Sequence, residues 1–563
     1  MSLLAWTWGT WPDVLVDFGR ELYVPWQIAE GKRLYLDLAW FNGPLSPHWN
    51  ALMFRLFGVG LRTLVWVNAA VFAVILVLLH SLLRSFGSRT SATIACLLVL
   101  AACGFGQLVG IGNYNYICPY SHEATHGLLL GLAALVCLQR WSGSGRLREL
   151  MAAAGLAGLC FLTKPEMFLA ALAASATVVG LRLWSARARI AIVAAVFALG
   201  VILPVLIAAG LLASWRGALG AWPALFATGM AASPFYRAGS GLDAPAANAF
   251  RMLGWAAGTA GLLLPGLLLG LSTRGSRQAR VAAWSAFAIS AAIVAVLYAR
   301  IPWTSAARPW PLLCLGVLVA AVLRFRAGET GTAAAAAGFA VFSLALLGKM
   351  LLNARLFHYG FALAMPALAL LTVVLYDWVP RWIAGRGGTA AVARAGLLPV
   401  LLAFALAHLG VTSRYLADKR EQVAAGTPDA FKADGRARAV NAVLEWIAAH
   451  PGTVLVVPEG VMINYLARSE NPTPFVNFMP PEMILFGEPH ILAALASRPP
   501  DVVVVTHKPT HEYGLPWFGR SYARDMGAWL ERHYHLVQLF GDPPLQPGSR
   551  YGIAILVRNA ESP

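Results

Sequence analysis

Four clusters of polar and ionisable side chains interrupt an otherwise apolar chain. The first cluster opens the sequence and contains Asp17, Arg20, Glu21 and Tyr23. Carboxylates suit acid–base chemistry, and charge at a membrane boundary is costly unless it is paired or functional. These four residues are therefore candidates for a substrate pocket. The alternative is a tryptophan-rich interfacial loop in which the acids only pair with neighbouring cations.

The second cluster places His122, Glu123 and His126 at helical spacing. Two histidines four residues apart lie on one face of a helix and can bind a metal ion. The pattern has no third ligand, so no metal or other cofactor is indicated. We expect the start of a helix whose polar side chains line a ligand pocket; a metal site and simple helix capping are the alternatives.

Cations dominate the third and fourth clusters. Lys164 and Glu166 flank Pro165, which predicts a break between two short apolar runs. A lysine beside broken helix ends suits phosphate, because free backbone N–H groups and the cation act together. The alternative is pairing of Lys164 with Glu166. The fourth cluster comprises Lys349, Asn353, Arg355, His358 and Tyr359. It suits an anionic headgroup, with snorkelling to lipid phosphates as the alternative.

Long apolar runs must position these clusters. The chain has 563 residues, of which 58% are hydrophobic and 12% charged, whereas soluble domains carry about 25% charged residues. A run of about 20 apolar residues can cross a bilayer as a helix. The sequence therefore predicts a mainly α, polytopic membrane bundle of about twelve helices over residues 62–412. The predicted spans are 62–83, 92–110, 125–139, 150–163, 167–182, 190–213, 253–272, 281–298, 311–323, 331–348, 360–376 and 395–412.

Lysine and arginine in short loops set the orientation of such a bundle. One set of alternate loops holds 16 arginines and three acids, which predicts that it faces the cytoplasm. Residues 1–61, the other loops and the tail then face outward, and all four clusters lie on that side. Since the cytoplasmic loops account for most of the net charge of +17, nucleic acid is not expected as a partner.

Residues 1–61 contain no apolar run long enough to span a membrane. They are predicted to form an extracytoplasmic first loop with a helix in the interface, whose apolar side includes Val16, Leu22, Trp26 and Ile28. An outward loop with no preceding span is unusual. We therefore also expect a further span upstream of Met1 in the gene.

The tail, residues 413–563, differs from the bundle in the length and composition of its apolar runs. Its valine-rich runs at 453–458 and 501–506 are bounded by turns, which is typical of strands covered on both faces. Further predicted elements are helices at 436–450 and 521–534 and strands at 534–540 and 552–557. The sequence thus predicts a small extracytoplasmic α/β domain. No catalytic residues are expected in it, so it would be a lid or an acceptor platform.

Short motifs of the opening loop form a recognisable series. They are DFGRELY at 17–23, EGKRLY at 30–35, GPL at 43–45 and LFG at 56–58. Together with the predicted topology, they resemble the multi-spanning glycosyltransferases of the GT-C superfamily. The most similar branch is the bacterial one related to protein O-mannosyltransferases and the lipid A aminoarabinose transferase.

The resemblance implies transfer of a sugar from a polyprenyl-phosphate donor to an unknown acceptor on the outer face of a bacterial plasma membrane, with inversion. Asp17 matches the first-loop acid of this family and would be the catalytic base. Lys164 and Arg355 match outer-loop positions of phosphate-binding cations, and Lys349 and His358 join them as candidates. A transporter or flippase for lipid-linked glycans is the alternative class; membrane lipids would contact either.

Overall fold

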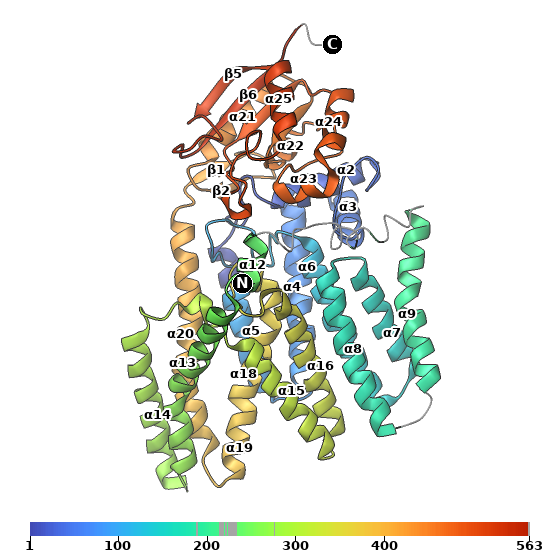
Figure 1. The fold of residues 1–563 in the computed structure, drawn as a ribbon. Helices are drawn as coiled ribbons and strands as arrows, with labels where there is room; N and C mark the ends of the chain where they lie inside the picture. The colour runs from blue at the N-terminus through green and yellow to red at the C-terminus, as the bar shows by residue number, and fades with distance from the viewer. Residues whose placement is uncertain (187–189, 213–218, 220–221, 223–233, 275, 561–563) are drawn as a thin grey trace.

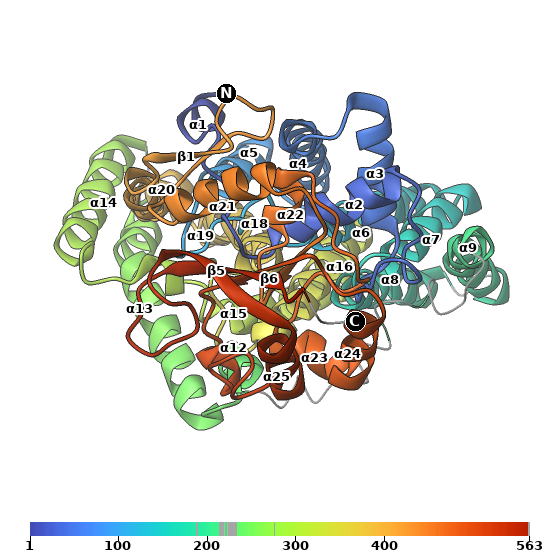
Figure 2. The ribbon, with the colours of Figure 1, turned by 90° about the horizontal axis from the view of Figure 1, so that it is seen from above.

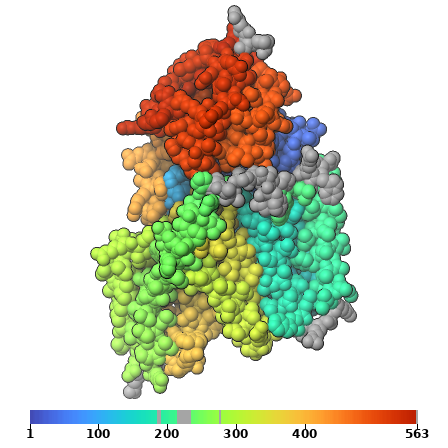
Figure 3. Space-filling view, in the orientation of Figure 1, coloured from blue at the N-terminus to red at the C-terminus, as the bar shows by residue number. Residues whose placement is uncertain are grey.

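The computed structural model has two parts, a helical bundle and a tail domain at one end of it (Figures 1 and 3). It describes residues 1–560 except 187–189, 213–218, 220–221, 223–233 and 275. The predicted cytoplasmic residues Arg187 and Arg189, and the last residue of the span 190–213, lie outside the described residues. The first loop lies between bundle and tail.

Eight helical segments among the described residues are long and apolar enough to cross a membrane. They are α4 (Leu61–Leu83), α8 (Pro165–Ala186), α9 (Ile190–Leu211), α12 with α13 (Pro234–Ser240 and Pro245–Ser272), α14 (Ser276–Leu297), α16 with η4 (Thr330–Leu347 and Gly348–Met350), α17 to α19 with η5 (Gly360–Leu363, Met365–Val373, Val374–Trp378 and Val379–Gly385) and α20 (Ala390–Ala417). The structure thus confirms a mainly α, multi-pass membrane bundle.

Four predicted spans fall on helices that do not meet this criterion of length and apolar character. These helices are α5 with the π-turn η1 (Arg89–Val99 and Leu100–Gly104), α6 (His122–Ser144), α7 (Leu147–Phe161) and α15 (Trp310–Arg326). The run 92–110 is helical only to Gly104. Twelve crossings therefore remain a prediction.

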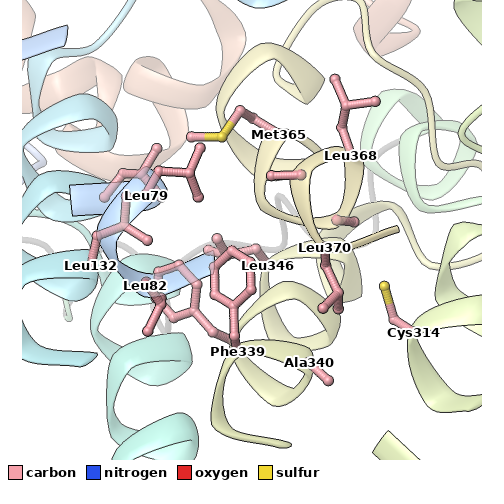
Figure 4. Close-up of a cluster of buried hydrophobic side chains, with 14 of the residues drawn as sticks. Leu79, Leu82, Leu132, Cys314, Phe339, Ala340, Leu346, Met365, Leu368 and Leu370 are labelled. Atoms are coloured by element: carbon pink, nitrogen blue, oxygen red, sulfur yellow. The ribbon is translucent and has the colours of Figure 1, made fainter. Parts of the chain in front are cut away.

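The bundle core consists of leucine, phenylalanine and alanine side chains from α4, α6, α16 and α18 (Figure 4). Residues 333–337, five alanines in α16, are all buried. A Cβ on Gly338 would lie 2.5 Å from the Val178 side chain of α8. Small residues let helix backbones approach closely, so this stretch fixes α16 against α8.

The tail contains a four-stranded sheet in the order β3-β4-β6-β5. Its strands are β3 (Val454–Val457), β4 (Val502–Thr506), β6 (Gly552–Arg558) and β5 (Tyr534–Gly541), of which only β3 and β4 are parallel. Val454 and Val456 pack with α21 (Ala437–Ala449), whereas Leu455 and Val457 pack with α24 (Glu488–Ser497) and α25 (Arg524–His533). Both faces are covered, which confirms the predicted α/β tail.

Smaller elements complete the two outer regions. The tail also contains β1 (Glu421–Val423), β2 (Phe431–Ala433), α22 (Met462–Ala467), α23 (Pro480–Phe486) and η6 (His511–Tyr513), and the first loop contains α1 (Ser2–Trp6), α2 (Phe18–Ala29) and α3 (Leu45–Phe57); the 3₁₀ turn η3 (Trp303–Ser305) precedes α15. Of these, only α2 is among the elements predicted above from the sequence.

The helix α2 differs from the prediction of an interfacial helix. Every residue from Phe18 to Ile28 is buried, because α22 of the tail packs beside α2 (Figure 2). A Cβ on Gly19 would lie 2.3 Å from the backbone nitrogen of Met462, so a glycine is needed at this contact. The apolar residues of α2 therefore face protein rather than lipid. Among the helices of the first loop, α3 exposes apolar side chains, with Leu56 and Phe57 at its end, and α1 exposes Trp6.

Candidate active site

A tight turn presents the Asp17 carboxylate. The side chain of Asp13 accepts hydrogen bonds from the backbone N–H groups of Leu15 and Val16, both at 3.0 Å, and so begins the bend. The Phe18 N–H then donates to the Val16 carbonyl at 2.6 Å. Asp17 therefore sits at φ 59° and ψ −61°, the rare γ-turn with positive φ. Such a conformation costs about 1–3 kcal/mol and is typical of functional sites.

The two carboxylate oxygens of Asp17 have different partners. Oδ1 forms an ion pair of 3.0 Å with Arg20, and Oδ2 accepts the Tyr114 hydroxyl at 3.4 Å. The second bond is long, so Oδ2 keeps capacity to accept another proton. Burial raises the pKa of Asp17, although Arg20 acts in the opposite direction. The group is therefore a stronger base than an exposed aspartate.

Arg20 is a buried cation among acids. Its guanidinium lies 3.7 Å from Glu21 and 3.9 Å from Glu482 of α23, in addition to Asp17. Burial acts to lower the pKa of Arg20, but these carboxylates outweigh burial and raise it. The alternative to a pocket was a solvated loop in which the acids pair with neighbouring cations. Asp17 does pair with Arg20, but this ion pair is buried inside the protein.

The start of α6 joins this acidic region. Glu21 accepts hydrogen bonds from the His122 backbone N–H at 3.1 Å and from the His122 ring at 2.7 Å. The Asn68 amide donates to the Ile117 carbonyl and to His122 Nε2, both at 2.9 Å. Nε2 is therefore the acceptor, and the ring proton lies on Nδ1. His122 orients Glu21, and neither side chain is exposed.

Lys164 stands at the break between α7 and α8. The Gly43 N–H donates to the Thr163 carbonyl at 2.8 Å, and a Cβ on Gly43 would lie 2.1 Å from the Leu162 carbonyl oxygen. The first loop thus closes directly on this break. Lys164 donates to the Tyr120 hydroxyl at 3.1 Å and lies over the Tyr120 ring.

Next to Lys164, the buried Glu123 is held in place by hydroxyl and amide donors. Ser121 donates to its carboxylate at 2.7 Å and Asn42 at 3.5 Å. His126 hydrogen-bonds Ser46 of α3. Among the described residues, no group of three His, Cys, Asp or Glu side chains could hold a metal ion.

Glu166 lies between the third and fourth clusters. It pairs with Lys349 at 3.0 Å and with Lys164 at 3.9 Å. The alternative predicted for Lys164 is therefore present, but one carboxylate is shared by two lysines. Glu166 can neutralise only one of the two positive charges of Lys164 and Lys349.

Arg355, His358, Tyr359 and Lys349 line a pocket of about 40 Å³ under α12, which has room for only a few waters. Burial, together with Arg355 and Lys349, lowers the pKa of His358 to about 3. The ring is therefore neutral and offers a hydrogen bond rather than a charge. A larger anion fits only if α12 or the side chains beneath it shift.

Aromatic rings connect the two sides of the site. Tyr114, which contacts Asp17, lies 4.2 Å from His358 and 5.3 Å from Tyr120, centroid to centroid. Tyr120 in turn contacts Tyr359 at 4.9 Å. Tyr114 thus stands between Asp17 and His358 of the cationic pocket. In the same way, Tyr120 stands between Tyr114 and Lys164.

Tyr23 lies apart from this group. Its hydroxyl accepts the Asn471 N–H at 2.9 Å in the seam between α2 and the tail. In this structure Tyr23 joins two parts of the protein and does not line the aromatic side of the site.

The tail contributes residues that the sequence did not point to. Glu459 follows β3 and Lys508 follows β4, and carboxyl ends of adjacent parallel strands meet at one edge of a sheet. This edge faces the first loop, where Glu459 accepts the Asp17 N–H at 3.1 Å. The available signal was an acid directly after a buried strand. The expectation of a tail without catalytic residues stays a prediction, but the tail does place Glu459 against the backbone of Asp17.

An apolar cavity of about 490 Å³ opens beside the site, between α13, α15, α18 and α20. Arg251 and Arg300 stand in its lining, with Trp303 and Trp310. The Leu356 N–H donates to the Thr304 carbonyl at 3.1 Å, which joins the cavity wall to the segment that carries Arg355.

Residues 42–208 match the family described as dolichyl-phosphate-mannose-protein mannosyltransferase. No curated protein matches the chain. Among solved structures, ArnT from Cupriavidus metallidurans bound to undecaprenyl phosphate is 12% identical with a TM-score of 0.49, over 100% of this chain and 96% of that one. An oligosaccharyltransferase from Archaeoglobus fulgidus in complex with zinc and sulfate is 12% identical with a TM-score of 0.48, over 98% and 70%.

The family match covers the end of the first loop and the helices α3 to α8 entirely, with most of α9. It includes Lys164 and the acidic start of α6. Through residues 42–208 the chain is similar to the dolichyl-phosphate-mannose-protein mannosyltransferases, which confirms the predicted resemblance to glycosyltransferases of the GT-C superfamily.

Proposed function

We propose that this protein is an inverting glycosyltransferase of the bacterial plasma membrane. It moves a sugar from a polyprenyl-phosphate donor to an acceptor hydroxyl or amine on the extracytoplasmic face, where the tail domain also lies. The matched family is named for a lipid-phosphate-linked sugar donor, which supports this donor class.

One observation carries the proposal. A single tyrosine, Tyr114, contacts both the Asp17 carboxylate and the His358 ring of the cationic pocket. A base for the acceptor and cations for a phosphate therefore lie on either side of one aromatic group. Transfer of a glycosyl group from a phosphate needs a base on one side of the sugar and cations on the other, because the sugar lies between the acceptor and the leaving group.

In the proposed reaction Asp17 Oδ2 takes the proton of the acceptor hydroxyl. The acceptor oxygen forms a bond to the anomeric carbon while the bond from that carbon to the phosphate oxygen breaks. The electron pair of the broken bond leaves with the lipid phosphate. Since attack and departure occur on opposite faces of the sugar, the anomeric configuration inverts.

The developing charge on the lipid phosphate would be stabilised by Arg355, Lys349 and Lys164. Phosphate binding replaces part of the contact between the two lysines and Glu166, and the neutral His358 donates a hydrogen bond. The phosphate leaves without being protonated, so a single carboxylate suffices for the chemistry.

The apolar cavity is the proposed place for part of the donor's prenyl chain. Its lining is almost entirely hydrophobic, and Arg251 and Arg300 stand with the tryptophans on the side where α13 begins and α14 ends. Burial and then Arg251 lower the pKa of Arg308, and burial and then Arg308 lower that of Arg355. Each of these arginines thus disfavours the charge of its neighbour, which an anion bound near them would relieve.

The test is sugar transfer by the purified protein in proteoliposomes, with radiolabelled undecaprenyl-phosphate mannose as the first probe and envelope membranes as the acceptor source. We expect Asp17→Asn to reduce turnover by about 10³-fold, within the range for loss of a general base. The control is Asp37→Asn, an acid of the same loop that is partly exposed and paired with Arg33.

Three results would separate the classes of function. Turnover that is lost in Asp17→Asn but kept in Asp37→Asn supports the transferase. Movement of the labelled lipid across the bilayer without turnover would replace it by the transporter. Full turnover in Asp17→Asn would remove Asp17 from the mechanism.

A further inference from the structure

Glu459 is the point at which the tail touches the candidate base. Its Oε1 accepts the backbone N–H of Asp17 at 3.1 Å, across 442 residues of sequence. The residue is 6% exposed. The contact is made to the backbone of Asp17, which has a positive φ, with φ 59° and ψ −61°.

The turn at Asp17 has other supports as well, since Asp13 accepts the Leu15 and Val16 N–H groups and the Asp17 carbonyl accepts the Arg20 N–H at 3.1 Å. Asn113 donates to the Val16 carbonyl at 2.9 Å, and Phe18 N–H closes the turn on the same oxygen. Both of these bonds hold the residue before Asp17. Only Glu459 binds the N–H of Asp17 itself, among the hydrogen bonds of the described residues. A residue with positive φ relaxes unless its surroundings hold it, so the bond to Glu459 is the tail's contribution to fixing the Asp17 backbone that carries the carboxylate.

The position of Glu459 is itself fixed. It lies two residues after the end of β3, and Thr506, the last residue of β4, donates from its side chain to the Glu459 carbonyl at 2.8 Å. Gly460 follows at φ 146°, where a Cβ would lie 3.0 Å from the Leu15 side chain of the first loop. The sheet thus carries a rigid carboxyl group to the first loop.

From this geometry we infer that the tail domain completes the active site, with Glu459 as the positioning residue that fixes the backbone of Asp17 and so aims the Asp17 carboxylate. The inference rests on the proposed function of Asp17. Glu459 does not touch the substrate. Its second oxygen, Oε2, is buried without a hydrogen-bond partner, and burial raises the pKa of Glu459 to about 8, opposed by Lys508. A protonated carboxyl still accepts through its carbonyl oxygen, so the charge is not what the contact requires.

The experiment compares Glu459→Gln with Glu459→Ala in the full-length protein. Glutamine keeps an acceptor oxygen, whereas alanine leaves the Asp17 N–H without one. We expect Glu459→Ala to lower kcat by about 10²-fold, the order that a misplacement of about 1 Å produces, with little change in KM. Glu459→Gln should retain most of the wild-type kcat.

The matched control is Glu488→Ala. Glu488 is another tail carboxylate that accepts a backbone N–H, that of Met526 at 2.9 Å, but it lies within the tail. Its loss should leave kcat unchanged. Equal kcat in Glu459→Ala and the wild type, or an equal loss in Glu459→Gln and Glu459→Ala, would overturn the inference.

A second measurement does not depend on transfer. Amide hydrogen exchange of a peptide that spans Asp17 should speed up in Glu459→Ala and stay slow in Glu459→Gln and Glu488→Ala. Unchanged exchange in Glu459→Ala would refute the positioning role even if the protein proved not to be a transferase. Conversely, the expected exchange pattern in a protein without turnover would leave the contact standing and remove only the proposed function.

Discussion

The two sides of the site compensate their charges differently. On the side of Asp17, carboxylates surround one buried cation, Arg20, and each contact lies inside the protein. On the side of Arg355, cations are in excess, since Lys164 and Lys349 share Glu166. Lys349 is 35% exposed at its side chain, against 9% for Arg20.

This difference bears on which side a ligand would rearrange. On the acidic side the base itself is held by Arg20 and Tyr114, as a base that must be aimed requires, although Oε1 of Glu21 and Oε2 of Glu482 are buried without a hydrogen-bond partner. The cationic side has charge left over and a pocket too small for a phosphate in this structure. It is the side that ligand binding must rearrange, because an anion supplies the missing charge.

The largest effect should come from removing the buried cation of the acidic side. Arg20→Ala leaves three carboxylates without their partner, and breaking a buried ion pair costs about 3–5 kcal/mol. We expect a large drop in the thermal unfolding temperature of the detergent-solubilised protein. Arg33→Ala, which removes an exposed cation of the same loop, should leave it unchanged. Equal unfolding temperatures for Arg20→Ala and Arg33→Ala would show that the acidic side does not depend on its cation.

Separating the first loop from the tail should have the next largest effect. In Gly19→Ala the new methyl group meets the Met462 backbone at 2.3 Å, and overpacking of this kind costs about 1–3 kcal/mol. Unfolding temperature and turnover should both fall, because the same seam carries Asp17. Gly155→Ala in α7, where a Cβ meets nothing within 4 Å, is the control. A neutral Gly19→Ala would mean that the seam is loose.

The cationic side should respond in affinity rather than stability. We expect Arg355→Ala and Lys164→Ala each to weaken binding of undecaprenyl phosphate by about tenfold, equivalent to about 1.4 kcal/mol. Thermal unfolding should change little, since this side has charge in excess. Arg62→Ala, an exposed cation at the start of α4, is the comparison. Unchanged affinity in both variants would overturn the assignment of these residues to the phosphate.

The smallest effect should be a displacement of the pH profile. The base must be ionised to work, so kcat/KM falls as the pH drops through the pKa of Asp17, which burial raises. The Tyr114 hydroxyl donates to the ionised carboxylate and favours that form. Tyr114→Phe should therefore move the acid limb of kcat/KM to higher pH. A limb that coincides with the wild type, or moves to lower pH, would show that Tyr114 does not stabilise the ionised base.

Much of the fold follows from local sequence patterns. The valine runs at 453–458 and 501–506 form the strands β3 and β4 within a residue or two, and each of the twelve predicted spans overlaps a helix, although the span 92–110 is helical only to Gly104. Both results have a physical reason. The length and period of an apolar run show which face of a helix or strand must be buried, and this can be determined for each element separately.

The failures share a cause as well. The sequence predicts that the apolar side of α2 faces the membrane. Contacts with lipid and with protein use the same apolar side chains, so the sequence alone does not distinguish them. Tyr23 reads as a pocket residue, yet it binds Asn471 in the tail. Glu459 gave no signal beyond its place after a strand, because its partner is 442 residues away.

The sequence by itself determined the helical bundle, the α/β tail and the gathering of ionisable residues in a few connecting segments. Hydropathy and local backbone preference are properties of each residue type, so they can be inferred from the sequence without coordinates. Only the tertiary structure decided that Asp17 sits in a constrained turn, that Arg20 is shared among three acids, and that Glu459 reaches the first loop. Those features arise from the docking of surfaces far apart in the chain, and the free energy of such docking depends on shapes that no local pattern encodes.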